Sequence, residues 1–142
     1  MSSEKVDSVR LLLREQHLDC LCISETWTTS SETADGILFP GFRVHRQDRQ
    51  APRRRGGRVR GGGVAVLVRE ELSAARLKTT SDPAGRLETL WLSVAGRGTR
   101  SAVVGVIYRP PDAPLTESLA DLRVQLEETI SRIKPFFSPW RP

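Results

Sequence analysis

The sequence predicts a single α/β domain, from the spacing of its apolar residues and from its length. Apolar residues at helical spacing over 4–16 are followed at once by the apolar run 18–23, which is too short for a helix of its own. Because that run carries almost no polar side chain, we expect a strand covered on both faces, as in the middle of a parallel α/β sheet. A chain of 142 residues is long enough for one such domain and too short for two.

Four further strands and a second helix are expected after this opening. The strands cover 42–46, which alternates like an edge strand, and then 64–68, 87–94 and 102–108. The last two strands are joined by a hairpin turn at 96–99. A helix begins near Thr116 and ends at Pro135, and an irregular tail is expected over 135–142. The helix carries one apolar stripe, formed by Leu119, Leu122, Leu126, Ile130 and Ile133.

The chain is basic, with 22 Lys and Arg against 17 Asp and Glu, a formal net charge of +5 and a pI near 10.0. This balance favours a polyanionic partner such as nucleic acid, although solubility alone would also explain it. The excess is concentrated in 43–63, a segment with eight arginines and repeated glycines that is expected to be a loop. Its arginines either grip phosphate groups or simply keep the loop solvated. The candidates for phosphate contacts are Arg53, Arg54, Arg55, Arg58 and Arg60.

Two cysteines, Cys20 and Cys22, lie on the same face of the first predicted strand. We expect both to be small buried hydrophobes, because neighbours at this spacing do not readily bridge and two such residues make no zinc site. Neither a signal peptide nor a membrane span is expected, since no apolar run reaches the length that either requires. The expected compartment is therefore reducing and intracellular, either the nucleus or the cytoplasm.

A carboxylate, Glu25, stands at the end of the first predicted strand. Ligands and catalytic groups collect at the carboxyl ends of strands in α/β sheets, so Glu25 is either a metal ligand or simply the cap of the following turn. Tyr108 ends the last predicted strand and is either a site residue or a rim aromatic. Glu88 lies near the start of the strand 87–94 and either reaches the site or pairs with Arg86.

Four motifs along the chain carry a resemblance to a known family. They are Cys22-Ile23-Ser24-Glu25-Thr26-Trp27, the glycine-containing segment 58–68, Arg86-Leu87-Glu88-Thr89-Leu90-Trp91-Leu92, and Val104-Gly105-Val106-Ile107-Tyr108-Arg109-Pro110-Pro111. In this order and spacing they resemble the endonuclease/exonuclease/phosphatase superfamily, and most closely the apurinic-type endonuclease domain of non-LTR (LINE-type) retrotransposons. The resemblance covers residues 5–134, and any one motif alone would be weak.

The resemblance implies a fold, a reaction and a partner. The fold is an incomplete two-sheet α/β sandwich flanked by helices, in which residues 1–134 form a partial domain that lacks the first strand and the C-terminal half. The reaction is Mg²⁺-dependent cleavage of a phosphodiester, with Glu25 as the metal ligand and Tyr108 donating its hydroxyl to the scissile phosphate. The partner is DNA, or else RNA, and the basic loop lies near its backbone.

The sequence also departs from this family. Relatives use an Asn or Asp on a strand before the opening helix, a Gly-Asp-Phe-Asn segment after the helix that follows the Tyr, and a closing Asp-His pair, and this sequence has none of the three. Its only histidines, His17 and His45, have no Asp partner in the expected place. Hydrolysis needs a charge clamp, an oriented water and a base, and only part of the clamp is kept. We therefore expect a fragment of a Mg²⁺-dependent DNA endonuclease domain of retrotransposon type that is inactive alone, with a non-catalytic basic nucleic-acid-binding module as the alternative.

Overall fold

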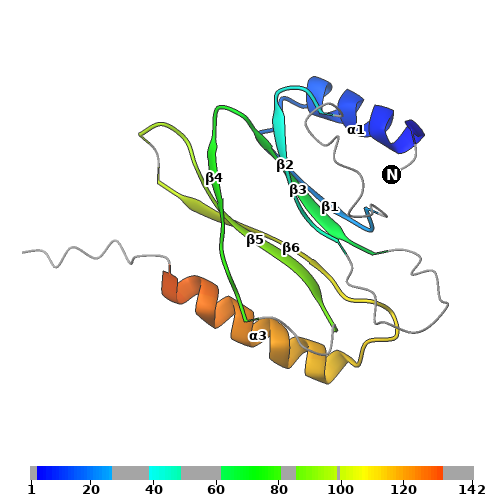
Figure 1. The fold of residues 1–142 in the computed structure, drawn as a ribbon, viewed down its shortest axis with the longest axis vertical. Coiled ribbons are helices and arrows are strands. Elements are labelled where there is room, and N and C mark those ends of the chain that lie inside the picture. The colour runs from blue at the N-terminus through cyan, green and yellow to red at the C-terminus, as the bar shows by residue number, and fades with distance from the viewer. Residues whose placement is uncertain (1–2, 27–38, 49–61, 81–85, 99, 133–142) are drawn as a thin grey trace, which may run out of the picture.

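Two three-stranded antiparallel sheets lie face to face, and each carries one helix on its outer face (Figure 1). The computed structural model describes residues 3–26, 39–48, 62–80, 86–98 and 100–132. The first sheet has the order β1-β3-β2, with β1 at Cys20–Ser24, β3 at Val64–Arg69 and β2 at Phe42–Gln47. The second sheet has the order β4-β5-β6, with β4 at Ser73–Arg76, β5 at Glu88–Ala95 and β6 at Ala102–Tyr108. The helices are α1 at Ser3–Glu15 and α3 at Leu115–Arg132.

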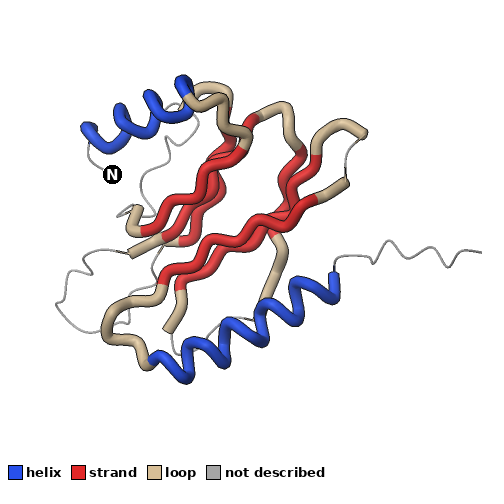
Figure 2. Tube along the Cα trace, turned by 180° about the vertical axis from the view of Figure 1, so that it is seen from behind, coloured by secondary structure: helices blue, strands red, loops and turns tan. Residues whose placement is uncertain are grey.

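The four layers follow one another as α1, first sheet, second sheet and α3, and the view from behind shows the same order (Figure 2). This arrangement confirms the α/β class and agrees with the two-sheet sandwich flanked by helices. The antiparallel pairing of every described strand contradicts the expectation of a parallel sheet. Antiparallel neighbours need no crossover helix, which is why so few helices suffice to cover both sheets.

The main core fills the space between the two sheets. β3 is the central strand of the first sheet, and its residues 64–68 are all buried, as predicted. Alternate side chains of β3 face the second sheet, while Leu67 points the other way toward α1. The core residues between the sheets are Val64, Val66, Val68, Leu90, Leu92, Val94 and Val106.

Helix α1 covers the outer face of the first sheet. Its span agrees with the predicted 4–16, and the buried residues Val6 and Leu13, two turns apart, pack with Phe42 and Leu67. The helix ends before His17, whose φ of 49° lies in the left-handed region and cannot continue the helix. The chain then turns directly into β1.

β1 is an edge strand, so the expectation of a strand covered on both faces is wrong. It pairs with β3 alone among the described strands, and its side chains are half-buried or exposed. Cys22 is exposed and Cys20 half-buried, which corrects the expectation that both are buried. Burial nevertheless raises the pKa of each thiol, so both stay protonated at neutral pH.

The remaining strands largely follow the prediction. β2 is an edge strand, as its alternation indicated, and β5 and β6 form the expected antiparallel hairpin. The four-residue strand β4 was not predicted, because its Ser-Ala-Ala-Arg sequence lacks the β-branched and aromatic residues that mark strands.

Helix α3 lies on the outer face of the second sheet with a polar side inward. An apolar stripe ordinarily faces a core, but here Leu119 is 55% and Ile130 is 62% exposed. The side that packs on the sheet instead buries Ser118, Gln125 and Thr129. The helix therefore forms over the predicted residues, but the side that packs on the second sheet is the polar one and not the apolar stripe.

Polar contacts hold α3 on the second sheet. Gln125 Oε1 accepts hydrogen bonds from Trp91 Nε1 at 3.0 Å and from Thr89 Oγ1 at 2.7 Å. Arg86 forms a two-pronged ion pair with Asp121, with N···O distances of 2.6 and 3.1 Å, and this pair lowers the pKa of the Asp121 carboxyl. The Trp91 ring lies across Gly105 on β6, where an added Cβ would come within 2.3 Å of it. Any larger residue at 105 would displace the ring.

Several sequence-based expectations fall outside the described residues. They concern Trp27 of the first motif, the arginine-rich part of 43–63, Ile133 and the tail at 135–142. Within the described ranges, no helix combines the length and apolar character needed to cross a bilayer.

Candidate functional site

Glu25 follows the last residue of β1 and is exposed at one end of the two-sheet core. Its φ of 54° is in the left-handed region, which costs a residue with a Cβ about 1–2 kcal/mol. The next residue, Thr26, is 2% exposed and donates its N–H to the carbonyl oxygen of Gly63 at 3.2 Å. The backbone around Glu25 is therefore fixed by a buried neighbour, which allows the unfavourable φ to persist.

The side chain of Glu25 meets Tyr108, the last residue of β6. The Tyr108 hydroxyl donates a hydrogen bond to Oε1 of Glu25. Because β1 belongs to the first sheet and β6 to the second, this bond joins the two sheets. The structure thus brings together two predicted site residues that lie 83 positions apart in the sequence. Their roles toward a metal and a phosphate remain predictions.

A second carboxylate, Glu88, begins β5 and lies directly opposite Tyr108 in the hairpin register. Its side chain is 8% exposed, and Oε2 accepts the N–H of Gly63 at 2.5 Å. A buried carboxylate is tolerated only where donors replace the water that it has lost, and the Gly63 amide supplies one such donor. The contact joins Glu88 to Gly63, whose carbonyl oxygen accepts the N–H of Thr26, the residue after Glu25.

Gly63 is the point where three chain segments meet. Its φ is 84°, and a Cβ at this position would lie 2.5 Å from Oγ1 of Thr26. Both the backbone conformation and the lack of space therefore require glycine here. Thr26 and Gly63 lie within two of the motifs quoted from the sequence, but sequence reasoning gave neither a role, because a backbone group used as an anchor has no side-chain signal.

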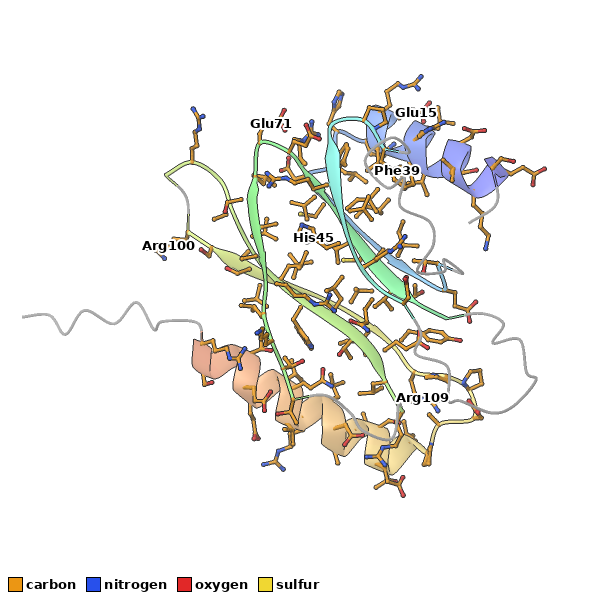
Figure 3. The ribbon with its side chains drawn as sticks, viewed as in Figure 1. Glu15, Phe39, His45, Glu71, Arg100 and Arg109 are labelled. Atoms are coloured by element: carbon orange, nitrogen blue, oxygen red, sulfur yellow. The ribbon has the colours of Figure 1, made fainter. Side chains whose placement is uncertain are left out.

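The side chains of His45 and Arg109 have surroundings other than Glu25. His45 lies between the two sheets (Figure 3). It belongs to β2, the edge strand opposite β1, and its register partner on β3 is Val66, which also pairs with Cys22, three residues before Glu25. Burial lowers its pKa, and Arg43 and Arg76 add to this, so His45 is neutral at pH 7. Arg109 follows Tyr108 and donates from Nη1 to the carbonyl oxygen of Ala113 at 2.5 Å. His45 is thus too far along the sheet to serve Glu25 as a base.

The side chains at this end of the sheets suit a magnesium ion that the protein holds through few ligands better than one that it encloses completely. Mg²⁺ is usually held by one or two carboxylates, and water and substrate phosphate complete its shell. Glu25 offers one exposed carboxylate with a phenol beside it, and this agrees with such a shared ion. Across the described ranges no three His, Cys, Asp or Glu side chains gather into a group that could enclose a metal.

The predicted phosphate-binding arginines lie outside the described residues. They are Arg53, Arg54, Arg55, Arg58 and Arg60. The segment that carries them leads in sequence to Gly62 and Gly63, which are buried at the Glu25 end of the sheets.

A comparison with protein-family models matches residues 2–137 to a model described as the Endonuclease/Exonuclease/phosphatase family. A comparison with curated proteins found no match. The family match spans nearly the whole chain and includes all four motifs, and Glu25, Glu88 and Tyr108 all lie within it.

Proposed function

Because the chain belongs to the endonuclease/exonuclease/phosphatase family, we propose that it is part of a Mg²⁺-dependent DNA endonuclease domain of the LINE-type retrotransposon kind. The family match supports a nuclease or phosphodiesterase type of domain, and the order of the four motifs favours the retrotransposon branch. The observation that carries the proposal is the contact between Glu25 and Tyr108 across the two sheets. These are the two residues that the resemblance assigns to the metal and to the scissile phosphate.

In this proposal the chain supplies one side of the site. Members of the family are generally metal-dependent, and a bound Mg²⁺ supplies positive charge that offsets the charge developing on a phosphodiester. The exposed carboxylate of Glu25 would hold the ion. Tyr108 donates to the same carboxylate, and its hydroxyl can turn toward a phosphate oxygen when substrate is bound.

We also propose that these 142 residues do not cleave DNA by themselves. Hydrolysis requires a base that activates water as well as a charge clamp. In the part of the chain that the structure describes, no cluster of acidic, histidine or cysteine side chains joins Glu25, and His45 lies elsewhere on the first sheet. The expected activity is thus many orders of magnitude below that of an intact relative.

Metal binding and cleavage test these two statements separately. Mn²⁺ serves as a paramagnetic substitute for Mg²⁺, and its electron spin resonance signal should fall on mixing with the chain but stay unchanged with Glu25→Ala. Nicking of supercoiled plasmid DNA in Mg²⁺ should stay at the background rate. Mn²⁺ binding that persists in Glu25→Ala would contradict the metal role, and Mg²⁺-dependent nicking lost in that variant would contradict inactivity.

A second candidate function is a basic module that holds nucleic acid without cutting it. The observation that favours it is the density of arginine in 43–60, with eight arginines and one acid. Each neutralised phosphate steepens the fall of log K with log salt by about 0.9, so replacing Arg53, Arg54 and Arg55 by alanine should flatten the slope by up to about 2.7. The matched control replaces Arg10, Arg14 and Arg123, three arginines on the helices, and should leave the slope unchanged.

Measurements with duplex DNA and duplex RNA of the same length would separate the two polyanions. Equal slopes for the two triple variants would contradict the binding module.

A further inference from the structure

Glu88 and Gly63 form a connection between the sheets that is distinct from the contact of Glu25 with Tyr108. Glu88 starts a strand of the second sheet, while Gly63 precedes β3 of the first sheet. The 2.5 Å bond from the Gly63 N–H to Glu88 Oε2 therefore crosses from one sheet to the other, as the Tyr108 bond to Glu25 does. Two hydrogen bonds with carboxylate acceptors thus tie the sheets together at the same end.

The two bonds belong to one closed circuit. Glu88 faces Tyr108 in the strand register, and Tyr108 donates to Glu25. Thr26, bonded covalently to Glu25, donates its N–H to the Gly63 carbonyl, and the Gly63 N–H returns the circuit to Glu88. Gly63 is therefore held through both of its backbone polar groups, one toward each sheet.

The circuit explains how an unfavourable backbone conformation is kept at Glu25. The left-handed φ of Glu25 aims its side chain at Tyr108 only while the Thr26 N–H stays on the Gly63 carbonyl. That carbonyl is fixed only while the Gly63 amide is fixed. The Gly63 amide is hydrogen-bonded to the side chain of Glu88, which is only 8% exposed. A displacement of Gly63 would therefore displace Glu25 through Thr26, the buried residue between them.

We propose that Glu88 is a positioning residue that holds Glu25 and Tyr108 in contact by fixing Gly63. Glu88 acts through the backbone and has no contact with a metal or a phosphate in this role. The consequence for metal binding rests on the proposed function, while the positioning role itself concerns only the geometry of the free chain.

The sequence provides a specific probe, because Tyr108 is the only tyrosine in the chain. With tyrosine labelled with carbon-13 at Cζ, the chain has one such NMR resonance, and its shift responds to loss of the hydrogen-bond acceptor of the hydroxyl. Glu25→Ala defines the position of this resonance without the acceptor. Glu88→Ala should move the resonance at least half of the way to that position, and Glu88→Gln, which keeps an acceptor oxygen, should move it much less.

Val66→Ala is the matched control, because Val66 lies in the core between the sheets and outside the circuit. It should lower the unfolding temperature and leave the tyrosine resonance in place. A Glu88→Ala resonance identical to that of the wild-type chain would overturn the proposal. So would an equal displacement in Val66→Ala, since the effect would then be general loosening.

A second measurement covers the case in which Glu88→Ala does not fold. In Glu88→Gln the Gly63 amide bonds to a neutral oxygen instead of a charged one, so its amide proton resonance should move upfield. An unchanged Gly63 resonance would show that the bond is absent and would overturn the proposal.

Addition of Mg²⁺ to the wild-type chain should shift the tyrosine resonance through Glu25. If that shift alone fails to occur, the proposed metal role is contradicted. The positioning role of Glu88 is still tested by the Glu88→Ala and Glu88→Gln variants.

Discussion

The two helices pack on their sheets in opposite ways. α1 turns Val6 and Leu13 inward, so its contact with the first sheet is apolar. α3 turns Gln125 inward and leaves Leu119 and Ile130 exposed, so its contact with the second sheet is largely polar. Apolar periodicity predicts that a helix forms, but the surface that it meets decides which side packs.

The outer face of the second sheet explains the polar contact. It presents Trp91, whose indole N–H must find an acceptor once it is buried, and Gln125 provides that acceptor. One turn further along the helix, Glu128 accepts hydrogen bonds from the hydroxyl of Thr80 and, at 2.6 Å, from its N–H, and these bonds lower the pKa of Glu128. Directional bonds of this kind fix the rotation of α3 about its axis, whereas apolar burial fixes that of α1.

The largest effect is expected at the apolar contact. Leu13→Ala should lower the free energy of unfolding by about 2–5 kcal/mol, because a buried leucine on α1 is replaced by a cavity. Urea denaturation followed by circular dichroism would measure the change. Leu11 is on the same helix but 50% exposed, so Leu11→Ala is the control and should change the free energy of unfolding little. Equal effects of the two substitutions would mean that α1 does not pack as described.

An intermediate effect is expected at the polar contact. Gln125→Ala removes the acceptor from the buried Trp91 N–H and should lower the free energy of unfolding by about 1–3 kcal/mol. The same denaturation experiment applies, with tryptophan fluorescence as a second signal. Thr129 lies on the same side of the helix, and within the described structure its hydroxyl is buried without a hydrogen-bond partner. Thr129→Val should therefore leave stability unchanged or raise it, and a loss as large as that of Gln125→Ala would contradict the polar contact.

Two apolar runs show how far the sequence predicts the fold. The runs 18–23 and 64–68 have similar composition, and both were expected to be buried strands. β3 is buried because it has a neighbour on each side and a covering layer on each face, while β1 has β3 on one side only among the described strands. Composition indicates a strand, but the number of neighbours depends on the rest of the fold and has no local signal.

The candidate site was predicted only in part, for a reason that lies in the strand register. Glu25 and Tyr108 each stand at the end of an apolar strand, and that position is visible in the sequence. A turn at 96–99 alone would pair residue 95 with residue 100 and therefore Val94 with residue 101. The structure instead pairs Val94 with Ala102, so the strand register differs by one residue. Because a one-residue slip turns every side chain to the other face, the place of Glu88 opposite Tyr108 could not be predicted.

The smallest effect is expected on the exposed stripe of α3. Ile130→Gln should change the free energy of unfolding by no more than about 0.5 kcal/mol, because the side chain is already 62% exposed. Leu13→Gln is the matched substitution on α1, where the same chemistry buries an amide and should be severely destabilising. Both variants would be measured by urea denaturation at two protein concentrations. A large loss in Ile130→Gln would contradict the polar packing of α3, and it would show that in solution the apolar stripe is the buried side of this helix.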